Sequence, residues 1–134
     1  MRVVLDTNVL LSAAFFPGVC DKLLVHCLLT PDVALILSQH ILDEFMEHGA
    51  GKLQGSPERL NAFANELRQH AQWVQPATMP TDAFKDADDL PVLGTAIAGQ
   101  AAYLVTGDKA LLALGNYQGV AFLSPRDFLD QVRS

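Results

Sequence analysis

The chain has 134 residues, half of them hydrophobic, which is enough to bury the core of one domain and excludes an intrinsically disordered protein. We expect a single domain over residues 1–134. No apolar run reaches the roughly 18 residues of a membrane span and no secretory signal opens the sequence, so we expect a cytoplasmic protein that engages no membrane. Fifteen Asp and Glu against nine Lys and Arg give a formal net charge of −6, which argues against extensive contact with a nucleic-acid backbone.

Strand-like and helix-like segments alternate through the first half of the chain. Residues 2–5 and 33–37 are continuous apolar runs, as in the buried strands of a parallel sheet. Periodicity and capping residues predict helices over 7–14, over 19–29, from Ser38 to the segment 48–51, and from Ser56 through Leu67. Cys20 and Cys27 fall about 10 Å apart along the second of these helices, too far for a disulfide, so we expect both thiols to be reduced.

The second half of the chain continues the alternation. We expect a short strand over 73–76, a helix over 91–98, a strand over 102–106, a helix over 110–114, a strand over 120–123 and a last helix that begins at Ser124. Such alternation is typical of βαβ units. It therefore predicts an α/β domain built on a parallel sheet with right-handed crossovers.

Four acidic residues lie where a predicted strand gives way to a helix, or on the helix that follows: Asp6, Glu44, Asp89 and Asp108. In an open sheet of this class, the carboxyl ends of the parallel strands line the crevice where ligands bind. Carboxylates that converge there repel one another unless a divalent cation neutralises them, and oxygen ligands suit Mg²⁺ or Mn²⁺. The pattern therefore predicts metal-dependent chemistry on phosphate.

Each of these acids also has a purely structural explanation. Asp6 and Asp108 could cap the helices that follow them, and one of two adjacent acids, Asp88 or Asp89, has to cap the helix after it. Glu44 could be a solvated helix residue, although it lies beside the apolar stripe of its helix. Any one of these acids is weak support for a site, whereas four of them at the carboxyl ends of one sheet are strong support.

The ordered set of motifs resembles the PIN-domain family. The matching segments are Asp6-Thr7-Asn8 after a strand, Ser38 to Glu44 on a helix, Asp89 before a helix of small residues, and Thr106-Gly107-Asp108 after a strand. The likeness extends over essentially the whole sequence. The stretches 86–93, 103–112 and 123–129 most resemble the branch that comprises the toxins of toxin–antitoxin pairs, the VapC-like ribonucleases.

This resemblance implies a three-layer α/β/α sandwich with a central parallel sheet of about four or five strands. It also implies an endoribonuclease that uses one or two Mg²⁺ or Mn²⁺ ions, an RNA substrate, a homodimer and a small antitoxin protein as partner. The residues that would bind the metal and cleave RNA are, by position, Asp6, Glu44, Asp89 and Asp108. Asn8 and Thr106 would support these carboxylates through hydrogen bonds, and Asp86 and Asp88 are further acids near the third position.

The chemistry of phosphodiester hydrolysis is consistent with such a set of residues. Two cations about 4 Å apart can activate water, neutralise the phosphoryl oxygens and stabilise the leaving oxygen without a histidine or a nucleophilic serine. The four histidines and two cysteines show no tight zinc-ligand spacing. Phe15 and Phe16, at the break after the first helix, could line a groove for a partner or a homodimer face, or could pack in the core.

Two other classes of protein compete with a nuclease. A PIN-like domain that has lost its activity would serve only as a binding or scaffold domain, but the four acids are all present. A receiver-like phosphoacceptor domain also binds Mg²⁺. It requires paired acids after the first strand, where this chain has only Asp6.

Overall fold

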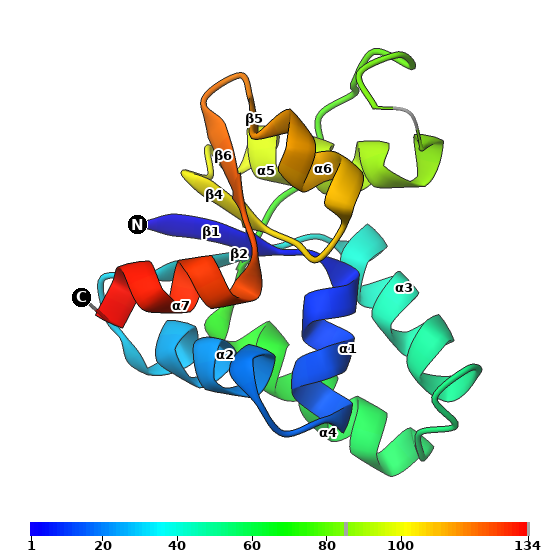
Figure 1. Ribbon diagram of the computed structural model, residues 1–134. Coiled ribbons are helices and arrows are strands. Elements are labelled where there is room, and N and C mark those ends of the chain that lie inside the picture. Colours follow the sequence, from blue (N-terminus) through cyan, green and yellow to red (C-terminus); the bar gives the residue numbers. More distant parts are fainter. Residues whose placement is uncertain (85, 134) are drawn as a thin grey trace.

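A sheet of six strands runs through the centre of the part of the molecule that the structure describes, residues 1–84 and 86–133 (Figure 1). In this computed structural model the strand order is β3-β2-β1-β4-β6-β5, and every neighbouring pair is parallel except β5 with β6. The strands are β1 (Arg2–Leu5), β2 (Ala34–Leu37), β3 (Gln72–Trp73), β4 (Tyr103–Val105), β5 (Asn116–Tyr117) and β6 (Val120–Leu123). Because β1 lies between β2 and β4, the ends of three segments far apart in sequence come together.

Helices cover both faces of this sheet. They are α1 (Thr7–Phe15), α2 (Val19–Leu29), α3 (Gln39–Ala50), α4 (Pro57–His70), α5 (Leu90–Ala98), α6 (Lys109–Leu114) and α7 (Pro125–Arg133), with a 3₁₀ turn, η1, at Ala87–Asp89. Helix α5 packs on β1, β2 and β4, and α6 packs on β6; α2 and α7 pack together on the other face (Figure 1). The three-layer α/β/α sandwich is confirmed.

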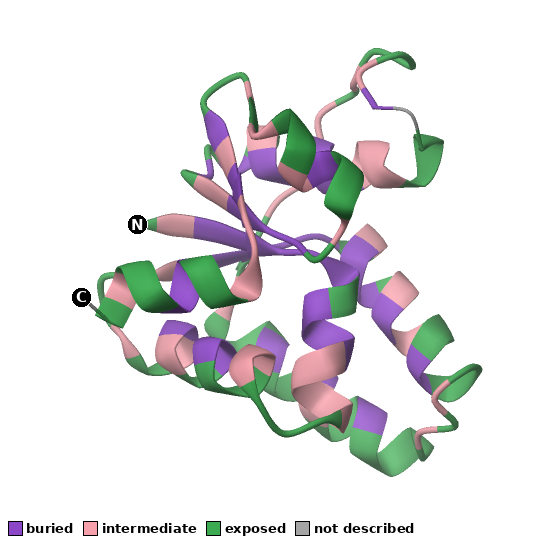
Figure 2. Ribbon diagram, viewed as in Figure 1, coloured by how far each residue is buried: buried purple, intermediate pink, exposed green. Residues whose placement is uncertain are grey.

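The core follows the central strands and the helix faces turned toward them (Figure 2). Val4 in β1, Ile36 in β2 and Leu104 in β4 are fully buried, as expected for strands covered on both faces. Ile41 and Phe45 of α3 are buried as well, which places their helix against this core. Burial of each such side chain stabilises the fold by about 1.5–3 kcal/mol.

The sheet has one short strand, β5, in addition to the five that the sequence predicts. Strands β5 and β6 form a hairpin whose turn residues, Gln118 and Gly119, have φ values of 47° and 89°. Positive φ at both positions gives the tight turn that matches the twist of a hairpin. Strand β3 covers only Gln72–Trp73 and so overlaps the expected range 73–76 at a single residue. Strands of two residues show no periodicity, so the expected number of about four or five strands falls short of the six observed.

No single helix within the described ranges is long and apolar enough to cross a membrane. Helices α1 and α2 reach that length and apolar content only when they are taken together, and they are bent by 102° at the break between them.

Both cysteines are free thiols. Cys27 is buried on the inner side of α2, and burial raises the pKa of its thiol to about 12 because the thiolate would lose its hydration. Cys27 is therefore a core residue, whereas Cys20 is only partly buried.

Gly94 marks the closest approach of α5 to the segment after β3. A Cβ atom at this position would lie 2.3 Å from the backbone oxygen of Ala77, whose N–H donates to the Gly94 oxygen at 3.0 Å. Gly94→Ala should therefore destabilise the protein by about 1–3 kcal/mol through overpacking, although alanine ordinarily favours a helix interior. Gly107→Ala is the control, because a Cβ there meets nothing within 4 Å. Urea denaturation measures both variants, and equal stability would contradict the packing described.

Candidate active site

The first acid, Asp6, is held where β1 and β4 end side by side. Leu5 pairs with Val105 in the sheet, which makes Asp6 and Thr106 neighbours. Asp6 is only 6% exposed; its Oδ1 accepts a hydrogen bond from the Thr7 N–H and its Oδ2 accepts one from the Thr106 hydroxyl, both at 2.8 Å. Two donors from two segments thus fix the orientation of this carboxylate.

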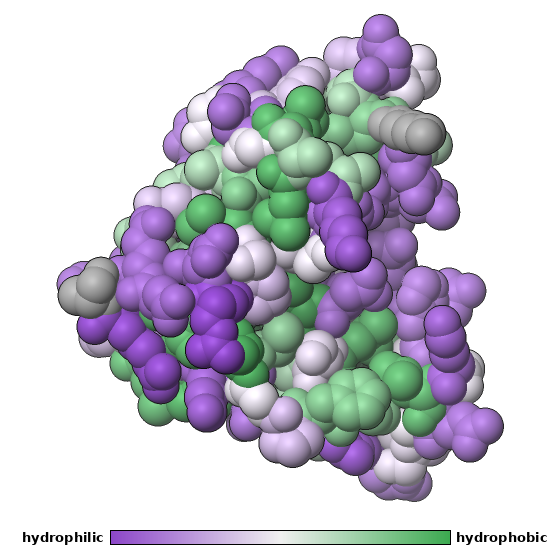
Figure 3. Space-filling model, in the orientation of Figure 1, coloured by the Kyte–Doolittle hydropathy of each residue, from purple (hydrophilic) through white to green (hydrophobic). Residues whose placement is uncertain are grey.

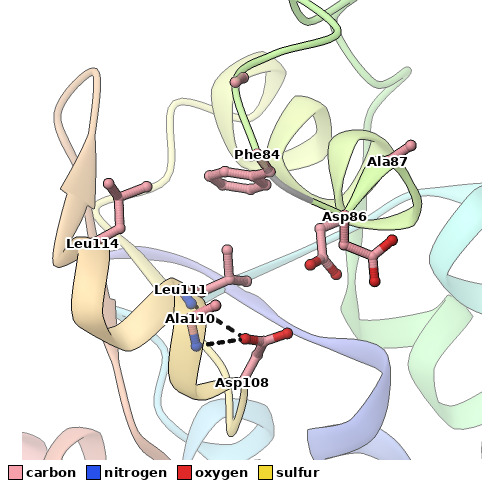
Figure 4. A pocket seen from close by; sticks show the side chains of 9 residues that line it. Phe84, Asp86, Ala87, Asp108, Ala110, Leu111 and Leu114 are labelled. Atoms are coloured by element: carbon pink, nitrogen blue, oxygen red, sulfur yellow. Dashed lines mark hydrogen bonds between the residues drawn. The ribbon is translucent and has the colours of Figure 1, made fainter.

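Thr106 connects Asp6 to a second acid, Asp108. The Thr106 side chain is fully buried, and its Oγ1 accepts a hydrogen bond from the Asp108 N–H at 3.0 Å. Asp108 Oδ1 accepts from the N–H groups of Ala110 and Leu111, at 2.8 and 3.2 Å, and so caps α6 (Figure 4). Only one of its two oxygens serves the cap, so the other is available to a ligand.

Glu44 reaches the same edge of the sheet from α3, the helix that follows β2. Its Oε1 accepts a hydrogen bond from the Thr7 hydroxyl at 2.8 Å. Thr7 therefore holds two acids at once, Asp6 through its N–H and Glu44 through its hydroxyl. The sequence pointed to Asn8 for such support. In the structure the Asn8 side chain is exposed and lines a separate pocket, and it donates to no carboxylate among the described residues.

Asp89 differs from the other acids because no capping bond occupies its side chain. It stands at the N-cap position of α5, but its carboxylate accepts no capping hydrogen bond there. Asp86 takes the local structural role instead, since its Oδ1 accepts from the Asp88 N–H at 3.0 Å and caps the 3₁₀ turn. Asp88 is exposed. Of the three neighbouring acids, Asp89 is thus the one that is partly buried and left without a capping role.

The pKa values show that the four acids share one electrostatic environment. Burial, above all, raises the pKa of Asp6, and the negative charges of Glu44 and Asp108 raise it further. Burial also raises the pKa of Asp89 to about 6, with additional repulsion from Asp6, Asp108, Asp86 and Glu44. Desolvation and like charges both disfavour an ionised carboxylate. The acids therefore lie close enough to destabilise one another when all are ionised.

A pocket of about 610 Å³ opens beside this cluster, between η1 and α6 (Figure 4). Asp86, Asp89 and Asp108 form its acidic side, and Phe84 and Leu111 belong to its apolar wall. In Figure 4 the carboxylates of Asp86 and Asp108 point into the gap between η1 and α6. Asp6 and Glu44 do not line this pocket, so the cluster lies at its edge rather than inside it.

The chemistry of these side chains fits a divalent cation, although no ready-made ligand set is present. Among residues 1–84 and 86–133, no three His, Cys, Asp or Glu side chains lie close enough to hold one ion as they stand. The groups available are hard carboxylate oxygens, which Mg²⁺ and Mn²⁺ prefer. Their mutual repulsion, seen in the raised pKa values of Asp6 and Asp89, is what a bound cation would relieve.

The raised pKa of Asp89 predicts a pH dependence of stability in the metal-free protein. Between the ordinary value of 3.8 and about 6, the folded state binds more protons than the unfolded state. The contribution of Asp89 to stability therefore falls as pH rises through this window and is lost above it. In EDTA, the stability advantage of Asp89→Asn over the wild type should grow from pH 4 to pH 7 in urea denaturation. The control is Asp88→Asn, at an exposed neighbour, whose stability difference from the wild type should change less between pH 4 and pH 7. An equal change in the two variants would contradict the assignment of the raised pKa to Asp89.

The fold and the acidic edge define an α/β domain with a candidate metal-dependent site, and comparison with known proteins places it in a family. Residues 2–110 match the family model described as the PIN domain, so the chain belongs to the PIN-domain family, as its motifs predict. A search of the curated proteins finds no match.

A solved structure shares the fold. It is a chain in the crystal structure of VapBC2 from Rickettsia felis bound to a DNA fragment from their promoter. The TM-score is 0.61 at 16% sequence identity, and the alignment covers 92% of this chain and 98% of that chain. At this identity the similarity concerns the fold.

Proposed function

We propose that residues 1–134 act as a single PIN-like domain that hydrolyses RNA phosphodiester bonds as a Mg²⁺- or Mn²⁺-dependent endoribonuclease. The observation that carries the proposal is the arrangement of Asp6, Glu44, Asp89 and Asp108: Thr7 and Thr106 join the first, second and fourth by hydrogen bonds, and the third lines one pocket with Asp108. Membership of the PIN-domain family supports it. One or two bound cations would activate the attacking water and neutralise charge on the phosphate.

The residues of this chain have distinct tasks in that reaction. Asp6 is the central ligand, because it is buried and held in place by donors on both oxygens. Thr106 and Thr7 hold Asp6, Glu44 and Asp108 near one another, and the carboxylates would close the remaining distances when a cation binds. Asp89 completes the set from the side of the pocket, where a nucleotide of the substrate would lie.

Incubation of RNA with the protein and Mn²⁺ or Mg²⁺, with and without EDTA, tests this function. Cleavage that requires the metal supports a nuclease. Metal binding without cleavage would instead favour an inactive PIN-like binding or scaffold domain. Transfer of a phosphoryl group from a small donor to an Asp side chain of the protein would favour a receiver-like phosphoacceptor domain, which the lack of a second acid beside Asp6 after the first strand already disfavours.

We further propose that the protein is the toxin of a toxin–antitoxin pair in the cytoplasm, possessing a small antitoxin partner and forming a homodimer. The similarity to a chain of the VapBC2 structure and the sequence motifs support this assignment. Phe16 is 55% exposed and lines a pocket of about 440 Å³ between α1 and α3, which is suited to an apolar segment of a partner. Figure 3 shows apolar surface in this region, and a second apolar area over α6. Phe15 instead packs beneath Arg59, whose guanidinium carbon lies 4.9 Å from the ring centre.

Expression of the chain alone should slow growth of the host cell, because an unrestrained ribonuclease damages cellular RNA. Co-expression of a small protein encoded next to it should restore growth if it inserts an Arg or Lys among the acids in place of the metal. Growth curves with the wild type and with Asp6→Asn measure the effect, the variant being the matched control. Normal growth at high expression of an active enzyme would favour a housekeeping nuclease over a toxin.

A further inference from the structure

His40 lies one helical turn before Glu44 on α3 and faces the same way. Residues four apart on a helix are neighbours on its surface. The Nε2 atom of His40 lies 3.3 Å from Oε1 of Glu44. The His40 side chain is 33% exposed, but its Nε2 atom is buried. The ring therefore turns its inner nitrogen toward a proposed metal ligand and leaves its other edge to solvent.

This buried nitrogen has no hydrogen-bond partner within the described residues. The separation from Glu44 is that of an ion pair, but the contact does not have the geometry of a hydrogen bond. A buried polar atom left unpaired costs about 1–3 kcal/mol. A hydrogen bond to Oε1 of Glu44, which lies 3.3 Å away, would remove this cost.

The contacts of the Glu44 carboxylate are one-sided. Thr7 and His40 both approach Oε1, one with its hydroxyl at 2.8 Å and the other with its ring at 3.3 Å. No hydrogen bond to Oε2 is found in the parts of the chain that the structure describes. We propose that His40 is a positioning residue that, together with Thr7, holds Oε1 and thereby presents Oε2 of Glu44 to the cation. The proposal rests on the metal-dependent function proposed above.

Groups that orient the ligands of a metal raise its affinity without touching it, and their loss typically costs about 10- to 100-fold. His40 is suited to this task by its reach. From the first turn of α3 it contacts Glu44, but it lines neither the pocket beside the acids nor the pocket that Phe16 lines. We therefore propose no contact of His40 with the substrate. Its removal should lower the metal affinity rather than the rate of the chemical step.

The test compares His40→Leu, which removes the ring nitrogen, with His40→Gln, whose amide can still donate to Glu44 from the preceding turn. Isothermal titration with Mn²⁺ measures affinity, and RNA cleavage is followed at increasing Mn²⁺. His70→Leu is the matched control, since His70 is an exposed histidine that lies one turn after a glutamate on its own helix, with its Nδ1 3.6 Å from Oε2 of Glu66. We expect His40→Leu to weaken Mn²⁺ binding about 10-fold, His40→Gln to retain most of the affinity, and saturating Mn²⁺ to restore cleavage. The melting temperature without metal verifies that each variant is folded.

Wild-type affinity in His40→Leu would overturn the proposal, as would equal losses in the Leu and Gln variants. A loss of cleavage that saturating Mn²⁺ does not restore would also overturn it, because positioning acts through affinity. These results leave the nuclease function intact as long as the wild type binds Mn²⁺ and cleaves RNA. Failure of the wild type itself to bind Mn²⁺ would remove both proposals together.

Discussion

Replacement of Asp6 by Asn should reduce metal-dependent RNA cleavage by about 100-fold or more and leave the fold intact. Loss of a group that merely orients a metal ligand already costs about 10- to 100-fold, so loss of a central ligand charge should cost at least as much. Asn is an equally good helix cap: its amide oxygen can still accept from the Thr7 N–H, and its NH2 group can donate to the Thr106 hydroxyl oxygen in place of the bond that Asp6 accepts there. Cleavage of a labelled RNA at fixed Mn²⁺ measures the effect, and circular dichroism verifies the fold.

The other acids should follow the same pattern, with an order that tests the site. Glu44→Gln and Asp108→Asn should also remove most of the activity. Asp89→Asn should cost more than Asp86→Asn, because the Asp86 carboxylate is engaged in capping the 3₁₀ turn. Asp127→Asn, an exposed acid in the first turn of α7, is the control and should leave cleavage unchanged. Full activity in the Asp6 variant would refute the proposed site. A larger loss of activity in Asp86→Asn than in Asp89→Asn would mean that Asp86, and not Asp89, is the third ligand.

Much of the fold could be predicted because strands covered on both faces are continuous apolar runs. The ranges 2–5 and 120–123 coincide with β1 and β6. Strand β4 was expected over 102–106, and backbone hydrogen bonds from Ala102 and from Thr106 to the neighbouring strands do extend over that range. The β5 hairpin and η1 were not foreseen, because pairs and triplets of residues take their conformation from the packing around them rather than from a repeating pattern.

The site was predictable in its position but not in its contacts. Parallel strands bring their carboxyl ends to one edge, so acids that follow β1 and β4 had to meet. Whether Thr7 or Asn8 would face Glu44 depends on the direction of each side chain in the first turn of α1, which sequence spacing does not determine.

The division of roles among the acids of the third segment follows from the geometry of η1. Residues three apart in a 3₁₀ turn lie on the same side. Asp86 and Asp89 therefore both line the pocket, while Asp88 points elsewhere. A sequence that offers three acids within four positions does not reveal this turn, so the choice among them required the three-dimensional structure.

Mn²⁺ should raise the melting temperature of the wild-type protein, and Asp6→Asn should have a higher melting temperature without metal but a smaller rise with it. At a hundredfold excess over its dissociation constant, a cation that binds only the folded state stabilises it by about 2.7 kcal/mol. For a domain of this size that corresponds to roughly 10 °C. Differential scanning calorimetry in EDTA and at increasing Mn²⁺ measures both effects.

The two effects have opposite signs because binding and stability are opposed at this site. The pKa of Asp6 is raised by burial and by neighbouring charges, so its ionised form destabilises the folded state at neutral pH. Asn removes that charge and with it both the repulsion and the attraction for Mn²⁺. Asp127→Asn should melt and respond as the wild type does, since its carboxylate is exposed on α7. If Asp6→Asn melts below the wild type in EDTA, the buried charge is already compensated by other groups of the protein. The acids would then not repel one another in a way that a bound cation relieves.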